Sequence, residues 1–155
     1  MKIPMSSDGV EIDPDLVLKG VGLRGVGKGP VRGAVLFWDG PISFLGDVDP
    51  DTGMLTVGGR TMNISEKVLF FIGGTGSTVG SYVLYNLKLN GKAPRAIVVK
   101  KADAIITIGC ILGDIPLVHK VSVEEWPQIT GKKLAEVNSA EGVVKVWKDQ
   151  QMIPG

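Results

Sequence analysis

A glycine-rich segment around a serine is the part of this sequence best suited to chemistry. Residues 68–72 are typical of a buried strand, and residues 73–81 follow as a glycine-rich turn that opens a helix. The first N–H groups of a helix have no partner within it, and the aligned peptide dipoles add partial positive charge there. The glycines leave room for a ligand to approach. The pattern predicts an anion-binding site with the hydroxyl of Ser77 at its mouth.

Three interpretations of this loop compete. A P-loop needs a lysine after the second glycine of its motif, and this segment has none. A dinucleotide fingerprint fits Gly74 and Gly76, but Gly80 comes one position late, and a Rossmann domain needs more βα units than the remaining residues supply. The third interpretation is a plain turn in which Ser77 or Thr78 caps the helix. The loop alone leaves this third interpretation open.

The remaining reactive side chains do not complete a reaction within this chain. The single histidine, His119, follows an apolar run and is predicted to end a strand rather than to act as a base for Ser77. The single cysteine, Cys110, is flanked by glycine and isoleucine, which favours a buried thiol. One cysteine excludes an internal disulfide and a metal cluster held by this chain alone. The sequence therefore predicts a binding module or one half of a shared active site.

Three aspartates alternate in a second polar segment, at Asp47, Asp49 and Asp51. A calcium loop would need more ligands and a terminal glutamate. The segment 49–53 has the sequence Asp-Pro-Asp-Thr-Gly, which is typical of a tight turn. We therefore expect an exposed turn in which aspartate side chains accept hydrogen bonds from backbone N–H groups.

Length and charge limit the possible classes of protein. The 155 residues suit a single domain, expected over residues 16–150, after a loosely held N-terminal arm over residues 1–15. Seventeen basic and 16 acidic side chains give a net charge of +1, with no basic stripe, so no nucleic-acid binding is expected. We find no signal-peptide pattern and no apolar run long enough to span a bilayer. A soluble, cytoplasmic protein without membrane partners is expected.

The hydrophobic pattern predicts many short strands and few helices. Strands are expected over residues 16–23, 33–38, 54–57, 67–72, 96–100, 116–119, 133–138 and 142–147, the last as an edge strand. The helix that follows Ser77 is expected to stop at Asn90-Gly91 and to bury Val79, Val83 and Leu87, with Tyr82 and Leu89 close to that face. A shorter helix is expected over residues 102–111. This pattern indicates a β-rich α/β domain, in the form of a partly closed barrel.

Four segments taken together resemble the small, swivel-like subunit of the aconitase X family. They are GPVRG at 29–33, ISFLGDVDPDTG at 42–53, GSTVGSYVL at 76–84, and APRAIV at 93–98 with IPLV at 115–118. The resemblance covers roughly residues 20–120. It implies an aconitase swivel-like fold, a swivelling β/β/α domain.

The resemblance also implies an activity that this chain does not perform alone. It implies a heteromeric hydro-lyase whose large subunit carries a [4Fe-4S] cluster, while the small subunit binds no cofactor. The implied reaction converts a phosphorylated hydroxy acid, 5-phosphomevalonate, into trans-anhydromevalonate 5-phosphate and water in an archaeal-type mevalonate pathway. Two alternatives stay open: a related dehydratase of another hydroxy acid or of hydroxyproline, and a non-catalytic anion-binding module.

Site residues follow from the resemblance position by position. It implies that Ser77 is the proton acceptor and that Gly76, Thr78 and Ser81 shape the substrate site. Ser43 and Asp49, in the second matching segment, are further candidates for lining it. No metal ligand is expected in this chain.

One position in the loop departs from the family pattern. The family usually has arginine or lysine where this chain has Thr75, so one positive charge is missing. Arg24, Arg32, Arg60 or a partner side chain is expected to replace it. The departure bears on the substrate more than on the fold.

Overall fold

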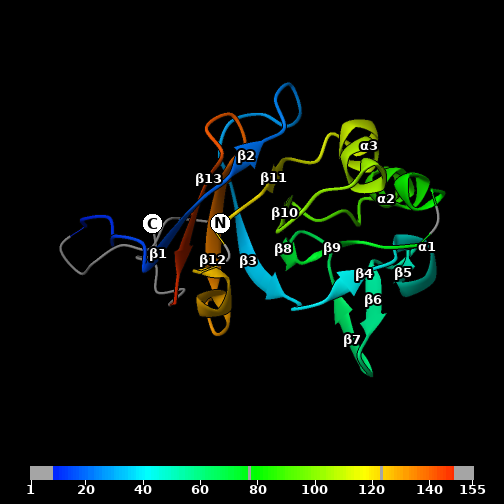
Figure 1. Ribbon diagram of the computed structural model, residues 1–155, viewed down its shortest axis with the longest axis horizontal. Helices are drawn as coiled ribbons and strands as arrows, with labels where there is room; N and C mark the ends of the chain where they lie inside the picture. Colours follow the sequence, from blue (N-terminus) through cyan, green and yellow to red (C-terminus); the bar gives the residue numbers. More distant parts are fainter. Residues whose placement is uncertain (1–8, 77, 123, 149–155) are drawn as a thin grey trace.

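The computed structural model describes residues 9–76, 78–122 and 124–148, in which eight strands form one mixed sheet (Figure 1). Across the sheet the strands run β1 (Leu16–Lys19), β13 (Val143–Trp147), β12 (Leu134–Asn138), β3 (Val31–Phe37), β8 (Val68–Phe71), β10 (Ala96–Val99), β11 (Leu117–His119) and β2 (Val21–Gly22). Strands β3, β8, β10 and β11 are parallel, and the other pairs are antiparallel.

The sheet almost closes on itself at Gly20. Strands β1 and β2 occupy its two opposite edges, yet only Gly20 separates them in the sequence. A Cβ atom on Gly20 would lie 2.4 Å from the carbonyl oxygen of His119, so this crossing has room only for glycine. The prediction of one strand over residues 16–23 was therefore wrong, because the two halves pair with different strands. The predicted partly closed, β-rich fold is confirmed.

Two hydrophobic cores lie on the two faces of the parallel strands. Alternate residues of β8 and β10 enter different cores: Leu69, Phe71, Ile97 and Val99 face one, and Val68, Phe70, Ala96 and Val98 face the other. Side chains alternate between the faces of a strand, so a strand covered on both sides is apolar at every position. This explains why β8 and β10 are continuous apolar runs in the sequence.

Two parallel crossovers place α2 (Gly80–Leu89) and α3 (Ala104–Gly113) together against one face of the sheet (Figure 1). The helices pack closely at Leu84 and Gly109, where a Cβ atom on Gly109 would lie 2.3 Å from Leu84 Cδ1. Asn90 and Gly91 end α2, as predicted, and Gly91 has a φ of +69°.

The predicted buried face of α2 is confirmed in part. Val83 and Leu87 are buried, whereas Tyr82 and Leu89 are 61% and 65% exposed and Val79 is 48% exposed. Gly80 and Leu84 replace them on the buried side because α2 contacts α3 as well as the sheet. Two of the predicted apolar side chains of this helix and its N-cap residue are thus exposed on this chain.

Several short elements near residues 40–63 were not predicted. They are β4 (Pro41–Ile42), α1 (Phe44–Asp47), β5 (Val48–Asp49) and β7 (Arg60–Asn63). The strand β6 (Met54–Val57), in the same region, was predicted. Two further short elements, β9 (Gly73–Gly74) and the 3-10 helix η1 (Trp126–Ile129), were also not predicted. Two-residue strands carry too little periodicity to be recognised in a sequence. The predicted turn is confirmed, because Asp51 N–H donates to Asp49 Oδ1 at 2.9 Å.

The C-terminal strand is not an edge strand. β13 lies between β1 and β12, so the prediction of an edge over residues 142–147 was wrong. Residues before β1 also contact the end of β13. Trp147 Nε1 donates to the carbonyl oxygen of Ile12 at 2.8 Å, and Lys148 N–H donates to Asp15 Oδ2 at 2.6 Å. Residues 1–8 and 149–155 lie outside the described residues, and the boundary at residue 15 stays a prediction.

Candidate functional site

The glycine-rich loop begins as a short strand beyond the carboxyl end of β8. Strand β9 pairs with β4 in parallel, and Thr75 N–H donates to the carbonyl oxygen of Ile42 at 3.1 Å. The loop is therefore tied to residues 41–42, which lead directly into Ser43. In open α/β sheets this edge, at the carboxyl ends of parallel strands, is where ligands bind.

Close packing explains the first glycines of the loop. A Cβ atom on Gly73 would lie 2.6 Å from the carbonyl oxygen of Lys101, and one on Gly74 would lie 2.6 Å from Asp103 Oδ2. Gly76 has a φ of +95°, and its Cβ would lie 2.6 Å from Ser43 Oγ. These glycines let neighbouring segments approach, a role that the sequence reading did not assign to them.

Ser77, the predicted proton acceptor, lies outside the described residues. Its neighbours Gly76 and Thr78 are exposed, and the exposed apolar residues Leu45 and Val79 flank this part of the loop. The two predicted residues next to Ser77 therefore stand at the surface of this chain. A second protein surface would be needed to exclude water from them.

The predicted binding residue Ser81 lies inside the first turn of α2. It is 5% exposed, and its Oγ donates to the carbonyl oxygen of Thr78 at 3.0 Å. The helix itself begins at Gly80, with Val79 at the N-cap position, and Tyr82 N–H donates to the carbonyl oxygen of Val79 at 3.0 Å. Ser81 thus contacts the backbone of Thr78. The helix cap predicted at Ser77 or Thr78 is not at Thr78, because Val79 is the N-cap, and Ser77 lies outside the described residues.

Ser43 is brought to the loop, whereas Asp49 is not. Ser43 is the N-cap of α1: its Oγ accepts from Gly46 N–H at 3.4 Å, and its own N–H donates to Asp47 Oδ2 at 2.9 Å. Asp49 lies in the turn beside Asn90, whose Nδ2 donates to the carbonyl oxygen of Pro50 at 2.8 Å. Asn90 caps the far end of α2. The length of that helix, about 15 Å, therefore separates Asp49 from the loop.

Two residues beside the loop were missed by the sequence analysis. Asp103 caps α3 through Oδ1, which accepts from Ile106 N–H at 2.8 Å, while Oδ2 lies against Gly74. An aspartate before an apolar helical run is an N-cap signal, so this residue was detectable. Lys101 N–H donates to the carbonyl oxygen of Ile72 at 3.2 Å. Lys101 lies beside the loop only because β8 and β10 are parallel neighbours, and no sequence motif predicts this position.

Lys101, whose side chain is exposed, is a basic residue with its backbone beside the loop, which has Thr75 where the family usually has a basic residue. Among the predicted replacements, Arg32 lies near the start of β3, at the other end of the parallel strands, where its Nε donates to Glu136 Oε2 at 2.7 Å. Arg24 follows β2 and Arg60 begins β7, and both are exposed. The backbone of Lys101 contacts Gly73 directly.

His119 and Cys110 lie away from this loop. His119 ends β11, as predicted, and β10 lies between β11 and β8, a backbone separation of about 10 Å. Partial burial, with the nearby charge of Lys120, lowers the pKa of His119 from its usual 6.5. Cys110 is fully buried, as predicted, and desolvation raises the pKa of its thiol far above the usual range. No group of three potential metal-ligating residues is found among the described residues.

The fold and this loop define the swivel domain of aconitase X. A family profile described as the aconitase X swivel domain matches residues 21–146, and the chain belongs to this family. A relative from Pyrococcus abyssi, named phosphomevalonate dehydratase small subunit, is 44% identical over 126 residues, which cover 79% of this chain and 95% of the relative. A relative of the same name from Methanosarcina acetivorans is 40% identical over 128 residues, covering 81% and 89% of the two chains.

A solved structure agrees with the fold. The crystal structure of Thermococcus kodakaraensis aconitase X in its holo-form is similar, with a TM-score of 0.75 and 44% identity over 84% of this chain and 98% of that chain. These findings confirm the predicted family and fold class. Among the described residues, no helix combines the length and apolar character needed to cross a membrane.

Proposed function

We propose that this chain is the small subunit of a heteromeric phosphomevalonate dehydratase. The enzyme would convert 5-phosphomevalonate into trans-anhydromevalonate 5-phosphate and water, and only together with a large subunit. The observation that carries this proposal is the match to proteins named phosphomevalonate dehydratase small subunit, which spans 95% of the Pyrococcus relative at 44% identity. A match over nearly the whole relative supports the same role more strongly than a shared fold does.

Ser77 is the proposed proton acceptor. In the reaction, a proton leaves the carbon next to the substrate carboxylate, the hydroxyl departs from the neighbouring carbon, and a carbon–carbon double bond forms between them. A serine hydroxyl accepts a proton efficiently only if its alkoxide is stabilised. Backbone N–H groups and the dipole at the start of α2 would supply that stabilisation once water is excluded. Gly76, Thr78 and Ser81 are proposed to shape the same anion site, with Lys101 as an additional cation.

The proposed [4Fe-4S] cluster belongs to the large subunit. The only thiol of this chain, Cys110, is buried in the core beside α2, and the described residues therefore do not fit the ligand set of such a cluster. When bound in the partner, the cluster would act as a Lewis acid on the departing hydroxyl group. The contribution of this chain to the chemistry of the reaction would come from the glycine loop and the residues around it.

An apolar surface supports the need for a partner. On α3, which has no charged residue, Ile108, Ile111 and Leu112 are 48%, 52% and 41% exposed. Tyr82, Tyr85 and Leu89 are exposed on the adjacent α2, and we call these six side chains the helix face. Exposed apolar side chains that gather on two packed helices are typical of an interaction surface. We propose that the helix face contacts the large subunit.

The test is reconstitution of the two-subunit enzyme. The chain is coexpressed with the candidate large subunit of its own organism, purified without oxygen, and assayed with 5-phosphomevalonate by following the unsaturated product. We expect turnover only when both subunits are present. Turnover of hydroxyproline or another hydroxy acid in place of 5-phosphomevalonate would contradict the proposed substrate. Turnover by the chain alone, or tight binding of a ligand at the glycine loop of the chain alone, would contradict the proposed subunit role.

The variant Ser77→Ala tests the proposed role of the serine. We expect the turnover number to fall by roughly 10²–10⁴, the usual contribution of a general base, with normal assembly. Thr61→Val is the matched control, because it removes an exposed hydroxyl on β7, outside the glycine loop, and keeps the size of the side chain. Full activity of Ser77→Ala in an intact complex would show that another group accepts the proton.

A further inference from the structure

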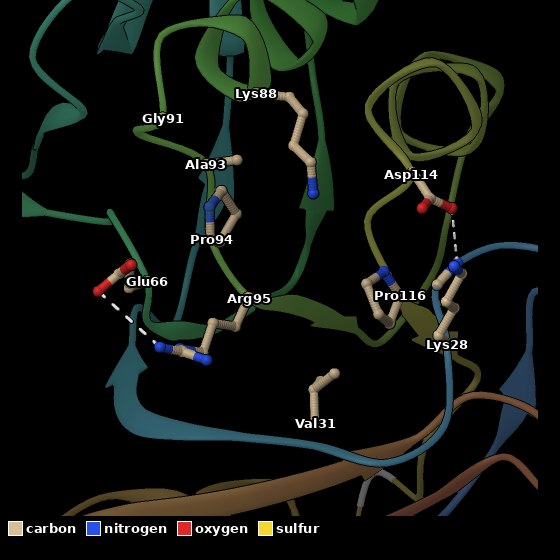
Figure 2. A pocket seen from close by; sticks show the side chains of 11 residues that line it. Lys28, Val31, Glu66, Lys88, Gly91, Ala93, Pro94, Arg95, Asp114 and Pro116 are labelled. Atoms are coloured by element: carbon tan, nitrogen blue, oxygen red, sulfur yellow. Dashed lines mark hydrogen bonds and ion pairs between the residues drawn. The ribbon is translucent and has the colours of Figure 1, made fainter. Parts of the chain in front are cut away.

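A hollow of about 460 Å³ lies at the opposite edge of the parallel strands from the glycine loop (Figure 2). It exists because β3 changes partner along its length. Residues 31–34 pair with β12, and only residues 35–37 pair with β8. The first half of β3 thus extends past the beginnings of β8 and β10, and the space between them is left open. Pockets of this size suit small organic ligands.

The ammonium group of Lys88 projects into this hollow from the last turn of α2 (Figure 2). Lys28 and Arg95 border the same space from two other segments. Within the described part of the chain, Lys88 and Lys28 form no ion pair, and Arg95 has a single weak one, with Glu66 at 3.9 Å. Three cations therefore surround the hollow, and two of them have no carboxylate partner.

The two carboxylates of the lining already have partners. Asp114 Oδ1 accepts from Gly27 N–H at 2.8 Å, and Glu66, whose side chain is 72% exposed, faces Arg95 (Figure 2). At the nearby helix ends, Gly91 N–H donates to the carbonyl oxygen of Lys88, and Asp114 N–H donates to the carbonyl oxygen of Ile111. Neither of these carboxylates forms an ion pair with Lys88.

The walls around Lys88 are apolar and stiff. Pro94 and Pro116 stand on either side of the space into which Lys88 points, and Val31 lies below it (Figure 2). Both prolines are buried, and proline rings fix the backbone and lose little freedom when a ligand binds. An apolar group can pack here while a charged group meets the lysine.

We propose that this hollow binds a small phosphomonoester with a short apolar chain. The phosphate would pair with Lys88, with Lys28 and Arg95 turning toward it, and the chain would lie between Pro94 and Pro116. Lysine and arginine are the common partners of phosphate in proteins. The ten-residue helix α2 separates Lys88 from the glycine loop, so this site is distinct from the proposed catalytic site and does not depend on it.

The probes are n-hexyl phosphate, inorganic phosphate and 1-hexanol, titrated into the full-length isotope-labelled chain and followed by backbone amide NMR. Hexyl phosphate is expected to bind saturably and to shift amide signals of residues 27–31, 88–95 and 114–116. Inorganic phosphate and hexanol are expected to bind at least roughly tenfold more weakly, because each keeps half of the contacts. Added salt should weaken binding of the phosphate ester.

Two matched lysine variants decide the proposal. Lys88→Met should weaken hexyl phosphate binding by roughly tenfold or more, whereas Lys92→Met, an exposed lysine outside the hollow, should not change it. Lys28→Met is the second variant and should weaken binding less. The proposal would be overturned if Lys88→Met bound hexyl phosphate as tightly as the unchanged chain does. It would also be overturned by absence of saturable binding, or by amide shifts confined to residues 73–82. Equal affinity for inorganic phosphate would overturn its apolar part.

Discussion

The hydroxyl group of Ser43 lies directly against Gly76, such that a Cβ atom on Gly76 would lie 2.6 Å from Ser43 Oγ. This contact joins two segments that are more than thirty positions apart in the sequence, and both match the aconitase X family. Ser43 also caps α1 and is tied to Asp47. The position of α1 therefore limits the position of the residue just before Ser77.

Gly76→Ala should disturb the loop in two ways. Its φ of +95° is unfavourable for alanine by about 1–3 kcal/mol, and the new methyl group would collide with Ser43 Oγ. We expect lower stability in chemical unfolding and at least a roughly tenfold loss of dehydratase activity in the reconstituted enzyme.

The double variant Ser43→Ala with Gly76→Ala separates the two effects. Removing Oγ relieves the closest contact but leaves the strained φ, so part of the loss should be recovered. Strictly additive effects of the two substitutions would mean that the collision between the new methyl group and Ser43 Oγ contributes nothing to the loss.

Ile108→Glu should weaken binding of the large subunit. Ile108 is 48% exposed on α3, so a glutamate there is tolerated in the free chain but would carry a charge into an apolar interface. We expect the dissociation constant to rise at least roughly tenfold, measured by calorimetry or by co-purification under increasing salt.

Thr61→Glu serves as its control, because Thr61 is exposed on β7, outside the helix face. It introduces the same charge and should leave the dissociation constant unchanged. A loss of binding in Thr61→Glu with none in Ile108→Glu would move the interface away from the helix face.

Gly22→Ala should destabilise the closure of the sheet. A Cβ atom on Gly22 would lie 1.5 Å from the carbonyl oxygen of Ser139, a backbone atom that cannot rotate away. We expect a loss of about 3 kcal/mol in the free energy of unfolding, measured with urea.

Gly46→Ala is the comparison for this variant. Its added methyl group would meet Ser43 Oγ at 3.5 Å, an ordinary contact, so the change should stay below about 1 kcal/mol. Similar losses for Gly22→Ala and Gly46→Ala would show that β2 is not held closely against Ser139.

Stability should fall as the pH drops below the usual pKa of histidine. His119 has a lower pKa in the folded chain than its ordinary value of 6.5, because of partial burial and then the charge of Lys120. A lowered histidine pKa means that the unfolded chain binds the proton more readily, so the contribution to stability is present above pH 6.5 and is lost as the pH falls toward the folded pKa.

NMR titration of the His119 ring checks this directly, and Lys120→Met should raise the measured pKa toward the ordinary value. In His119→Gln the pH dependence of stability in this range should become flatter. A folded pKa above 6.5 would contradict the prediction.

Features that depend on neighbours along the chain could be predicted from the sequence. The predicted strands other than residues 16–23 lie within two residues of their observed bounds, and the turn at Asp49–Asp51 and the end of α2 at Asn90 are as expected. Each of them rests on local periodicity, a turn residue or a cap, and these act over a few residues. The four matching segments also gave the family, which the comparisons confirm.

Contacts between segments distant in the sequence could not be predicted in this way, because they depend on the three-dimensional fold. A one-residue crossing at Gly20 divides an apparent single strand between two edges of the sheet, and the pairing of β4 with β9 brings Ser43 to Gly76. The same topology places Asp49 at the far end of α2 and opens the hollow at Lys88. These contacts depend on hydrogen bonds between strands distant in the sequence and on glycines, which lack a Cβ atom and so allow close approach. Neither feature produces a periodic signal in the sequence.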